Sequence, residues 1–156
     1  MVERARHESD ALLVKAREDA EALRSLGLLE RRGVQFHWRN AGYGSFDEFL
    51  EALSRDKRKK IRQERRKVAD AGVRFRWARG RDIATDDWDF FYRCYERTYL
   101  EHGNPPYLTR GFFERMARDM PENWLLFIAE REGQPIAGSL IGIGDGVAYG
   151  RYWGAL

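Results

Sequence analysis

Cysteine is nearly absent from the sequence, which holds a single copy, Cys94, in 156 residues. A lone cysteine cannot form an internal disulfide, and residues 1–10 are polar where a secretory signal would need an apolar segment. The longest apolar run covers only residues 124–129, far short of the roughly 20 residues that cross a bilayer. We therefore predict a protein of the reducing cytoplasm without a membrane span.

Histidine is also scarce, and its three copies are isolated from one another. Neither a cysteine nor a carboxylate stands at ligand spacing from His7, His37 or His102, so we predict no metal site. Cys94 lies inside an aromatic helical segment. Because a nucleophilic thiol needs a nearby base or a helix N-terminus, we interpret Cys94 as a small core residue.

Positive charge is concentrated in one segment. The whole chain carries +3, but residues 55–67 hold nine lysines and arginines against two acidic residues, a net charge of +7. Such a segment binds phosphates or serves as a solvated connecting helix, and the sequence leaves both interpretations open. On the first interpretation, the nucleic-acid or phosphate contacts come from Arg58, Lys59, Arg62, Arg65 and Arg66.

Proline is missing from the first half of the chain, which favours helices there. Residues 3–25, rich in Ala, Glu and Arg, predict a helix that ends at Gly27 in the left-handed conformation. Alternating apolar residues predict a short strand over residues 34–38. Ser45 and Glu48 form a capping-box pattern that predicts the start of the next helix.

The second half predicts a sheet with helices. Residues 73–77 alternate, which predicts a strand with three apolar side chains inward and two arginines outward. Two helices follow, one capped by Thr85 with a broad aromatic stripe and one capped by Thr109. Three antiparallel strands joined by tight turns are then predicted over residues 124–130, 136–143 and 147–153.

This element order predicts the α+β class, with a mixed sheet and flanking helices. A meander whose last strand is aromatic needs a covering layer on each apolar face, and only two helices are available for this purpose. We therefore expect the fold to be incomplete at Leu156.

Six motifs occur in order between residues 33 and 154: GVQFHW (33–38), FDEFL (46–50), RKKIRQERRK (58–67), PYLT (106–109), PIAG (135–138) and YGRYWG (149–154). Together they resemble the Fem-like, peptidoglycan-biosynthesis-type branch of the GNAT acyl-CoA N-acyltransferase superfamily, and especially its uncharacterised bacterial relatives. The resemblance implies a pair of GNAT-like domains.

On this resemblance, three parts of the chain have separate origins. Residues 1–44 correspond to the C-terminal remnant of a first GNAT-like domain, residues 45–71 to basic connecting helices, and residues 72–156 to the N-terminal half of a second domain. In GNAT enzymes the strand matching residues 147–153 precedes a loop and helix N-terminus that hold the pyrophosphate of acyl-CoA. The resemblance therefore implies a fragment that is inactive alone.

The same resemblance implies a parent protein that moves an acyl group from acyl-CoA or aminoacyl-tRNA to the amine of a small molecule or peptide. The amine would attack the thioester or ester while backbone donors hold the carbonyl oxygen. One alternative is a nucleic-acid-binding module that contacts RNA through residues 55–67. Another is an incomplete product that pairs its open sheet edge with a second chain.

Arg151 is the first candidate for substrate binding. On a regularly alternating strand it shares a face with Tyr149 and Trp153, so its guanidinium enters apolar surroundings and needs a partner. An anionic group of the donor or substrate fits, as does a structural salt bridge or an aromatic ring. Tyr152 and Tyr107 complete the predicted substrate-binding set.

Two further positions are candidates for the chemistry itself. Glu130, at the end of a buried strand, is either a catalytic base that deprotonates the acceptor amine or simply a charge at a hairpin end. Gly138 is predicted to mark a β-bulge, which in GNAT folds frees a backbone donor near the acyl carbonyl.

Overall fold

The computed structural model describes residues 2–29, 33–34 and 36–156 and divides into two units, residues 1–44 and residues 45–156. Helix α1 (Val2–Ser25) makes up most of the first unit. It ends as predicted, because Gly27 has a φ of +76° and donates its N–H to the carbonyl of Arg24 at 2.9 Å.

The strand predicted over residues 34–38 is wrong for the part that is described. Residues 34 and 36–38 have no regular secondary structure, and residue 35 lies outside the described residues. A strand needs a neighbour to satisfy its backbone groups, and the described residues of this unit contain no other strand. Alternation of apolar residues is therefore not sufficient to form a strand in this segment.

Two capped helices open the second unit. Helix α2 (Phe46–Glu51) begins at Ser45, whose hydroxyl accepts a hydrogen bond from the N–H of Glu48 at 3.2 Å, as the capping-box pattern predicted. Helix α3 (Arg55–Asp70) is capped in the same way by Ser54. None of the residues of α3 is buried.

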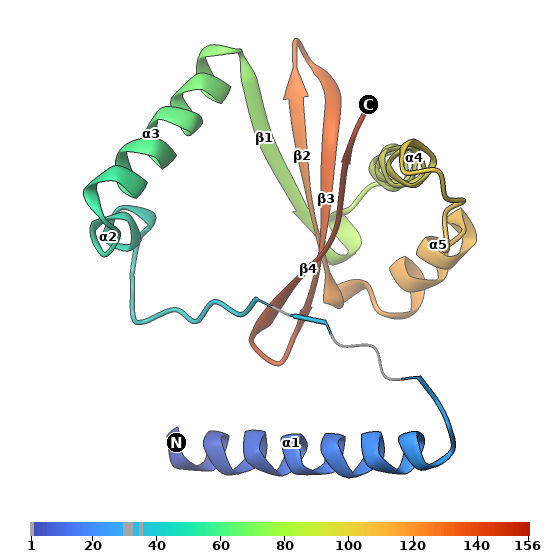
Figure 1. Ribbon diagram of the computed structural model, residues 1–156. Helices are drawn as coiled ribbons and strands as arrows, with labels where there is room; N and C mark the ends of the chain where they lie inside the picture. The colour runs from blue at the N-terminus through green and yellow to red at the C-terminus, as the bar shows by residue number, and fades with distance from the viewer. Residues whose placement is uncertain (1, 30–32, 35) are drawn as a thin grey trace. The chain divides into compact units, whose positions relative to one another are not determined.

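Four antiparallel strands form one sheet in the order β1-β2-β3-β4 (Figure 1). Their bounds are β1 (Val73–Arg79), β2 (Trp124–Arg131), β3 (Gln134–Gly144) and β4 (Val147–Ala155). Two-residue turns join the last three strands, and their first residues, Glu132 and Asp145, have positive φ and precede glycines, as tight hairpins require. The predicted meander and the α+β class are confirmed.

Two helices lie on one side of the sheet (Figure 1). They are α4 (Thr85–Glu101) and α5 (Arg110–Asp119), preceded and followed by the short 3-10 turns η1 (Gly80–Asp82) and η2 (Pro121–Asn123). The predicted Thr85 cap is wrong: the carbonyl of Ala84 accepts the first helical hydrogen bonds, so Thr85 is already helical. Thr109 caps α5 as predicted. No helix in the described part of the chain has the length and apolarity to cross a membrane.

The core lies between these two helices and the inner face of the sheet. Its least exposed side chains, at 0–1%, are Phe91, Cys94, Phe113, Leu126, Ile128 and Leu140. The aromatic stripe predicted for α4 is confirmed, since Trp88 and Tyr95 are also buried. Desolvation by burial raises the pKa of the Cys94 thiol, as expected for a core cysteine.

Strand β1 faces the core with the side that was predicted to face solvent. Phe75 and Trp77 are 66% and 65% exposed, whereas Arg76 and Ala78 are half-buried. The register with β2 accounts for this orientation, because Arg76 and Ala78 lie opposite the core residues Ile128 and Leu126. The Arg76 guanidinium lies within 2.6 Å of Asp87 on α4, so the ion pair allows an arginine on the inner face of the strand.

Strand β4 approaches α4 closely at Gly154. A Cβ at this position would lie 2.5 Å from the carbonyl oxygen of Cys94 and 2.6 Å from the hydroxyl of Thr98. Such distances leave no room for a side chain, so glycine allows the end of β4 to contact the second half of α4.

Candidate functional site

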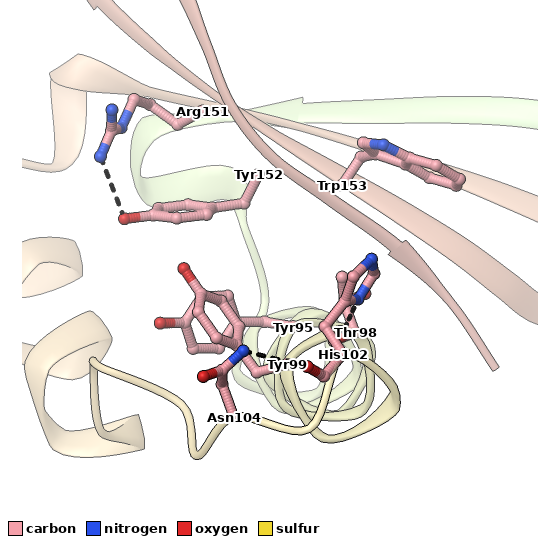
Figure 2. Close-up of a pocket in the computed structure, with 8 residues that line it drawn as sticks. All are labelled: Tyr95, Thr98, Tyr99, His102, Asn104, Arg151, Tyr152 and Trp153. Carbon is pink, nitrogen blue, oxygen red and sulfur yellow. Dashed lines mark hydrogen bonds between the residues drawn. The ribbon is translucent and has the colours of Figure 1, made fainter. Parts of the chain in front are cut away.

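A pocket of about 290 Å³ opens between β4 and the C-terminal end of α4 (Figure 2). Its lining residues are Tyr95, Thr98, Tyr99, His102, Asn104, Arg151, Tyr152 and Trp153. Aromatic walls combined with a few polar groups are typical of a small-ligand site. This pocket, which we call the α4–β4 pocket, is the candidate functional site.

Arg151 reaches the pocket from a β-bulge. Tyr152 pairs with Leu140 on β3, but the next pair joins Gly150 to Ile141, so Arg151 is an extra residue without a partner on that strand. A bulge re-aims the side chain it carries. The regular alternation that was predicted for this strand is therefore wrong.

The bulge also separates residues that were expected on one face. Tyr149 pairs with Gly142 and Trp153 with Ser139, three positions apart on β3, so their side chains lie on opposite faces of the sheet. The bulge predicted at Gly138 is wrong, because this residue pairs in register with both neighbouring strands. The sheet has two extra residues instead: Ile136 in β3, between the pairs Ala129–Ala137 and Glu130–Pro135, and Arg151 in β4.

Arg151 is exposed and contacts an aromatic ring. One of its terminal nitrogens donates to the Tyr152 hydroxyl at 3.2 Å, and the guanidinium carbon lies 5.1 Å from the centre of that ring (Figure 2). Within the described residues no carboxylate pairs with Arg151. A guanidinium has five N–H donors, so several remain for an anionic ligand.

Three tyrosines form the apolar part of the pocket. The Tyr95 ring centre lies 4.7 Å from that of Tyr99 and 5.1 Å from that of Tyr152. The Tyr95 hydroxyl accepts a hydrogen bond from the N–H of Leu108 at 3.1 Å. Burial raises the pKa of Tyr95 to about 12, so this phenol is neutral at physiological pH and acts as a wall of the pocket.

His102 lies at the corner of the pocket where α4 ends. Its Nδ1 is 2.6 Å from the carbonyl oxygen of Thr98, one turn earlier. The Asn104 side chain donates to the carbonyl of His102 at 3.0 Å, and Gly103 between them has a φ of +73°. These hydrogen bonds fix the loop that follows α4.

The structure brings together three of the five predicted substrate-binding residues. Arg151, Tyr152 and Trp153 line the pocket, whereas Tyr149 and Tyr107 do not. Tyr107 is 80% exposed, and its ring centre lies 5.4 Å from that of Tyr99.

Sequence reasoning missed the α4 side of the pocket. The aromatic residues of the helix capped by Thr85, which include Tyr95 and Tyr99, were predicted only as a stripe, and His102 was considered only as a metal ligand. A signal was present, since a histidine followed by glycine and asparagine directly ends an aromatic helix.

Glu130 lies away from the pocket, on β2, and belongs to an ion-pair network. The Nε of Arg76 is 2.6 Å from a Glu130 carboxylate oxygen, and the other guanidinium nitrogens bind both oxygens of Asp87 at 2.6 and 2.8 Å. Hydrogen bonds to Asp87, and then to Glu130, raise the pKa of Arg76. The geometry gives Glu130 a structural partner, and its catalytic role stays a prediction without support.

The basic side chains of α3 do not all lie in one environment. Arg55, Arg58, Lys59, Arg62, Gln63 and Arg66 line a depression of about 810 Å³, which we call the basic face. Arg65 lies elsewhere, with its guanidinium 4.4 Å from the centre of the Phe46 ring. Four of the five predicted phosphate contacts therefore share one face of the helix.

Comparison with known proteins identifies a family for the chain. The FemAB-like family model, described as peptidoglycan biosynthesis/recognition, matches residues 1–156. No curated protein matches the sequence. Because the match extends over the whole chain, the protein belongs to the FemAB-like family.

Proposed function

We propose, on the premise of this FemAB-like membership, that the protein serves peptidoglycan biosynthesis by transferring an acyl or aminoacyl group to an amine. The observation that carries the proposal is the α4–β4 pocket, where tyrosine rings and one available guanidinium line about 290 Å³. Because of this pocket we propose activity for this chain, in place of the inactivity that the resemblance implied. The related expectations, a GNAT-type fold ancestry and a cytoplasmic setting, are part of the same proposal.

In this proposal Arg151 binds a carboxylate of a peptide acceptor. Its exposed position and single hydrogen bond to Tyr152 leave donors for a two-point contact, which suits the planar carboxylate group. The rings of Tyr95 and Tyr99 contact the aliphatic part of the acceptor, since flat apolar walls favour such chains.

The reaction joins the acceptor nitrogen to the acyl carbon. The amine attacks the carbonyl of a thioester, if the donor is acyl-CoA, or of an ester, if it is aminoacyl-tRNA. A C–N amide bond forms, the C–S or C–O bond breaks, and the leaving group departs with a proton. The two donors remain alternatives within the proposal.

A transfer assay with two donor arms tests the proposal. The protein is incubated with a peptide amine and either radiolabelled acyl-CoA or radiolabelled aminoacyl-tRNA, and amide product is counted. We expect product in one arm, and a fall in kcat/KM of about tenfold or more for Arg151→Met, because a charge-assisted contact is lost.

Arg93→Met is the matched control for this assay. Arg93 is also exposed and lies over an aromatic ring, that of Phe90 at 5.7 Å, but it does not line the pocket. Unchanged activity is expected for this variant. The proposal is overturned if neither donor gives product, and the role of Arg151 is overturned if both variants behave alike.

A second candidate function is favoured by the basic face of α3. We propose that its five cationic side chains bind the phosphate backbone of RNA. These side chains lie along one face of the helix, which favours a linear polyanion as the ligand over a small molecule, because a polymer offers phosphates in a row.

A further inference from the structure

We propose that His102 is the general base of the transfer reaction, an inference that rests on the proposed function. It is the one imidazole among the residues that line the α4–β4 pocket, and it lies there together with Arg151 and the tyrosine walls. An amine must lose a proton to become an amide, so a proton acceptor is required in the pocket. The imidazole is the side chain best suited to this role near neutral pH.

The tautomer of His102 follows from its hydrogen bond. Nδ1 lies 2.6 Å from the carbonyl oxygen of Thr98, and a carbonyl oxygen can only accept, so Nδ1 carries the proton. In the neutral ring Nε2 is then the unprotonated nitrogen, and its lone pair is not used by this hydrogen bond. The main chain of α4 thus holds the ring in the form that a base needs.

The backbone that carries the ring is also hydrogen-bonded. Asn104 donates to the carbonyl of His102 at 3.0 Å, and the N–H of Asn104 binds the carbonyl of Tyr99 at 3.0 Å. Gly103, with a φ of +73°, allows this turn. The backbone at the end of α4 that carries the imidazole is therefore hydrogen-bonded to the following loop, which favours a constant backbone conformation at His102.

In the proposed step Nε2 of His102 takes the proton that the attacking nitrogen loses as the C–N bond forms. The bond between the acyl carbon and the donor sulfur or oxygen breaks, and the leaving atom accepts a proton from the resulting imidazolium. His102 returns to its neutral form, so protons balance over one turnover.

The groups that surround His102 define the expected pH dependence. The titratable or charged residues lining the pocket are Arg151 and Tyr152 from β4 and Tyr95 and Tyr99 from α4. None of them is a carboxylate that could take over the role of base. Loss of the basic nitrogen at position 102 should therefore alter the pH–rate profile, with no second base in the pocket to replace it.

The test compares the pH profile of the protein with that of His102→Asn. Asparagine keeps a side-chain N–H donor but has no basic nitrogen. We expect kcat to drop by about 10²- to 10⁴-fold with little change in KM, and the acidic limb of the pH–rate profile to disappear. Added imidazole should restore part of the activity.

His37→Asn is the matched control, because His37 does not line the pocket, and it should leave the profile unchanged. Nitrogen-15 NMR of the His102 ring supplies a readout independent of turnover, with protonated Nδ1 and unprotonated Nε2 expected at alkaline pH. The opposite tautomer overturns the inference, as does a His102→Asn variant with unaltered kcat.

These outcomes separate the inference from the proposed function. If the unmodified protein makes no amide with either donor, the proposed function fails and the base assignment fails with it. If product forms equally well with the native protein and with His102→Asn, only the base assignment is wrong.

Discussion

Helices α3 and α4 have nearly the same length, 16 and 17 residues, but opposite relations to the rest of their unit. Helix α4 buries five side chains, whereas α3 buries none. Apolar burial is the main favourable term in folding, so α4 is held by packing. Helix α3 is held by its serine cap and by surface contacts with α2, such as Arg65 over Phe46, and it presents charge to solvent.

This contrast suits the two helices to different kinds of binding site. The α4–β4 pocket sits at the end of the packed helix, where Tyr95 and Tyr99 extend the core toward the ligand. A site supported by a packed core can hold side chains within a narrow range of positions. The basic face lacks such support, and binding through it would depend on charge number and salt.

The largest expected effect tests the packed helix. Phe91 on α4 is 0% exposed and lies within 5.3 Å of the Phe113 ring, centre to centre. Phe91→Ala should lower the free energy of unfolding by about 3–5 kcal/mol, because it removes apolar contacts and leaves a cavity. Urea unfolding followed by circular dichroism measures this loss.

Phe75→Ala is the control for this substitution. Phe75 is 66% exposed on β1, so the same change should cost less than about 1 kcal/mol. Equal losses for the two variants would contradict the division between a packed and an exposed side of the sheet.

The next largest effect is expected for a substitution of Tyr95, which lies where the core meets the pocket. Tyr95→Phe leaves the N–H of Leu108 without its acceptor, at an expected cost of about 1–3 kcal/mol at neutral pH. Burial raises the pKa of Tyr95 to about 12, above the value of about 10 for an unfolded chain. The folded state therefore favours the protonated phenol, and this contribution is complete below pH 10 and is lost as the pH rises toward 12.

Unfolding midpoints in urea between pH 9 and 11 measure this linkage. The native protein should lose stability more steeply over this range than Tyr95→Phe, because only the native protein carries the buried phenol. Parallel pH dependences for the two proteins would mean that Tyr95 ionises as it does in the unfolded chain.

Local sequence signals were enough to predict most of the second unit. Serine and threonine caps, glycine turns and the spacing of aromatic residues act over a few positions, and Ser45, Thr109 and the aromatic stripe of α4 were found where expected. The family resemblance was likewise visible in short motifs.

The errors arose where distant residues decide the local geometry. The inward position of Arg76 depends on how β1 pairs with β2, which is far away in the sequence. The bulge at Arg151 depends on how β4 pairs with β3. His102 became part of a site only because β4 packs beside the end of α4, which no local pattern indicates.

The smallest expected change in stability tests the exposed helix and separates charge from packing. Lys59 and Arg66 line the basic face, and the double variant Lys59→Ala, Arg66→Ala should alter the free energy of unfolding by less than about 0.5 kcal/mol. Its affinity for RNA at low salt should nevertheless fall, and the slope of log affinity against log salt should decrease in magnitude by about 1.4, since two phosphate contacts are lost.

The double variant Lys60→Ala, Lys67→Ala is the control. It removes the same charge from residues that do not line this face and should bind RNA more tightly than the first double variant. Equal weakening by both variants would indicate attraction by total charge without a defined face, and absence of RNA binding at low salt would remove the nucleic-acid proposal while leaving the α4–β4 pocket untouched.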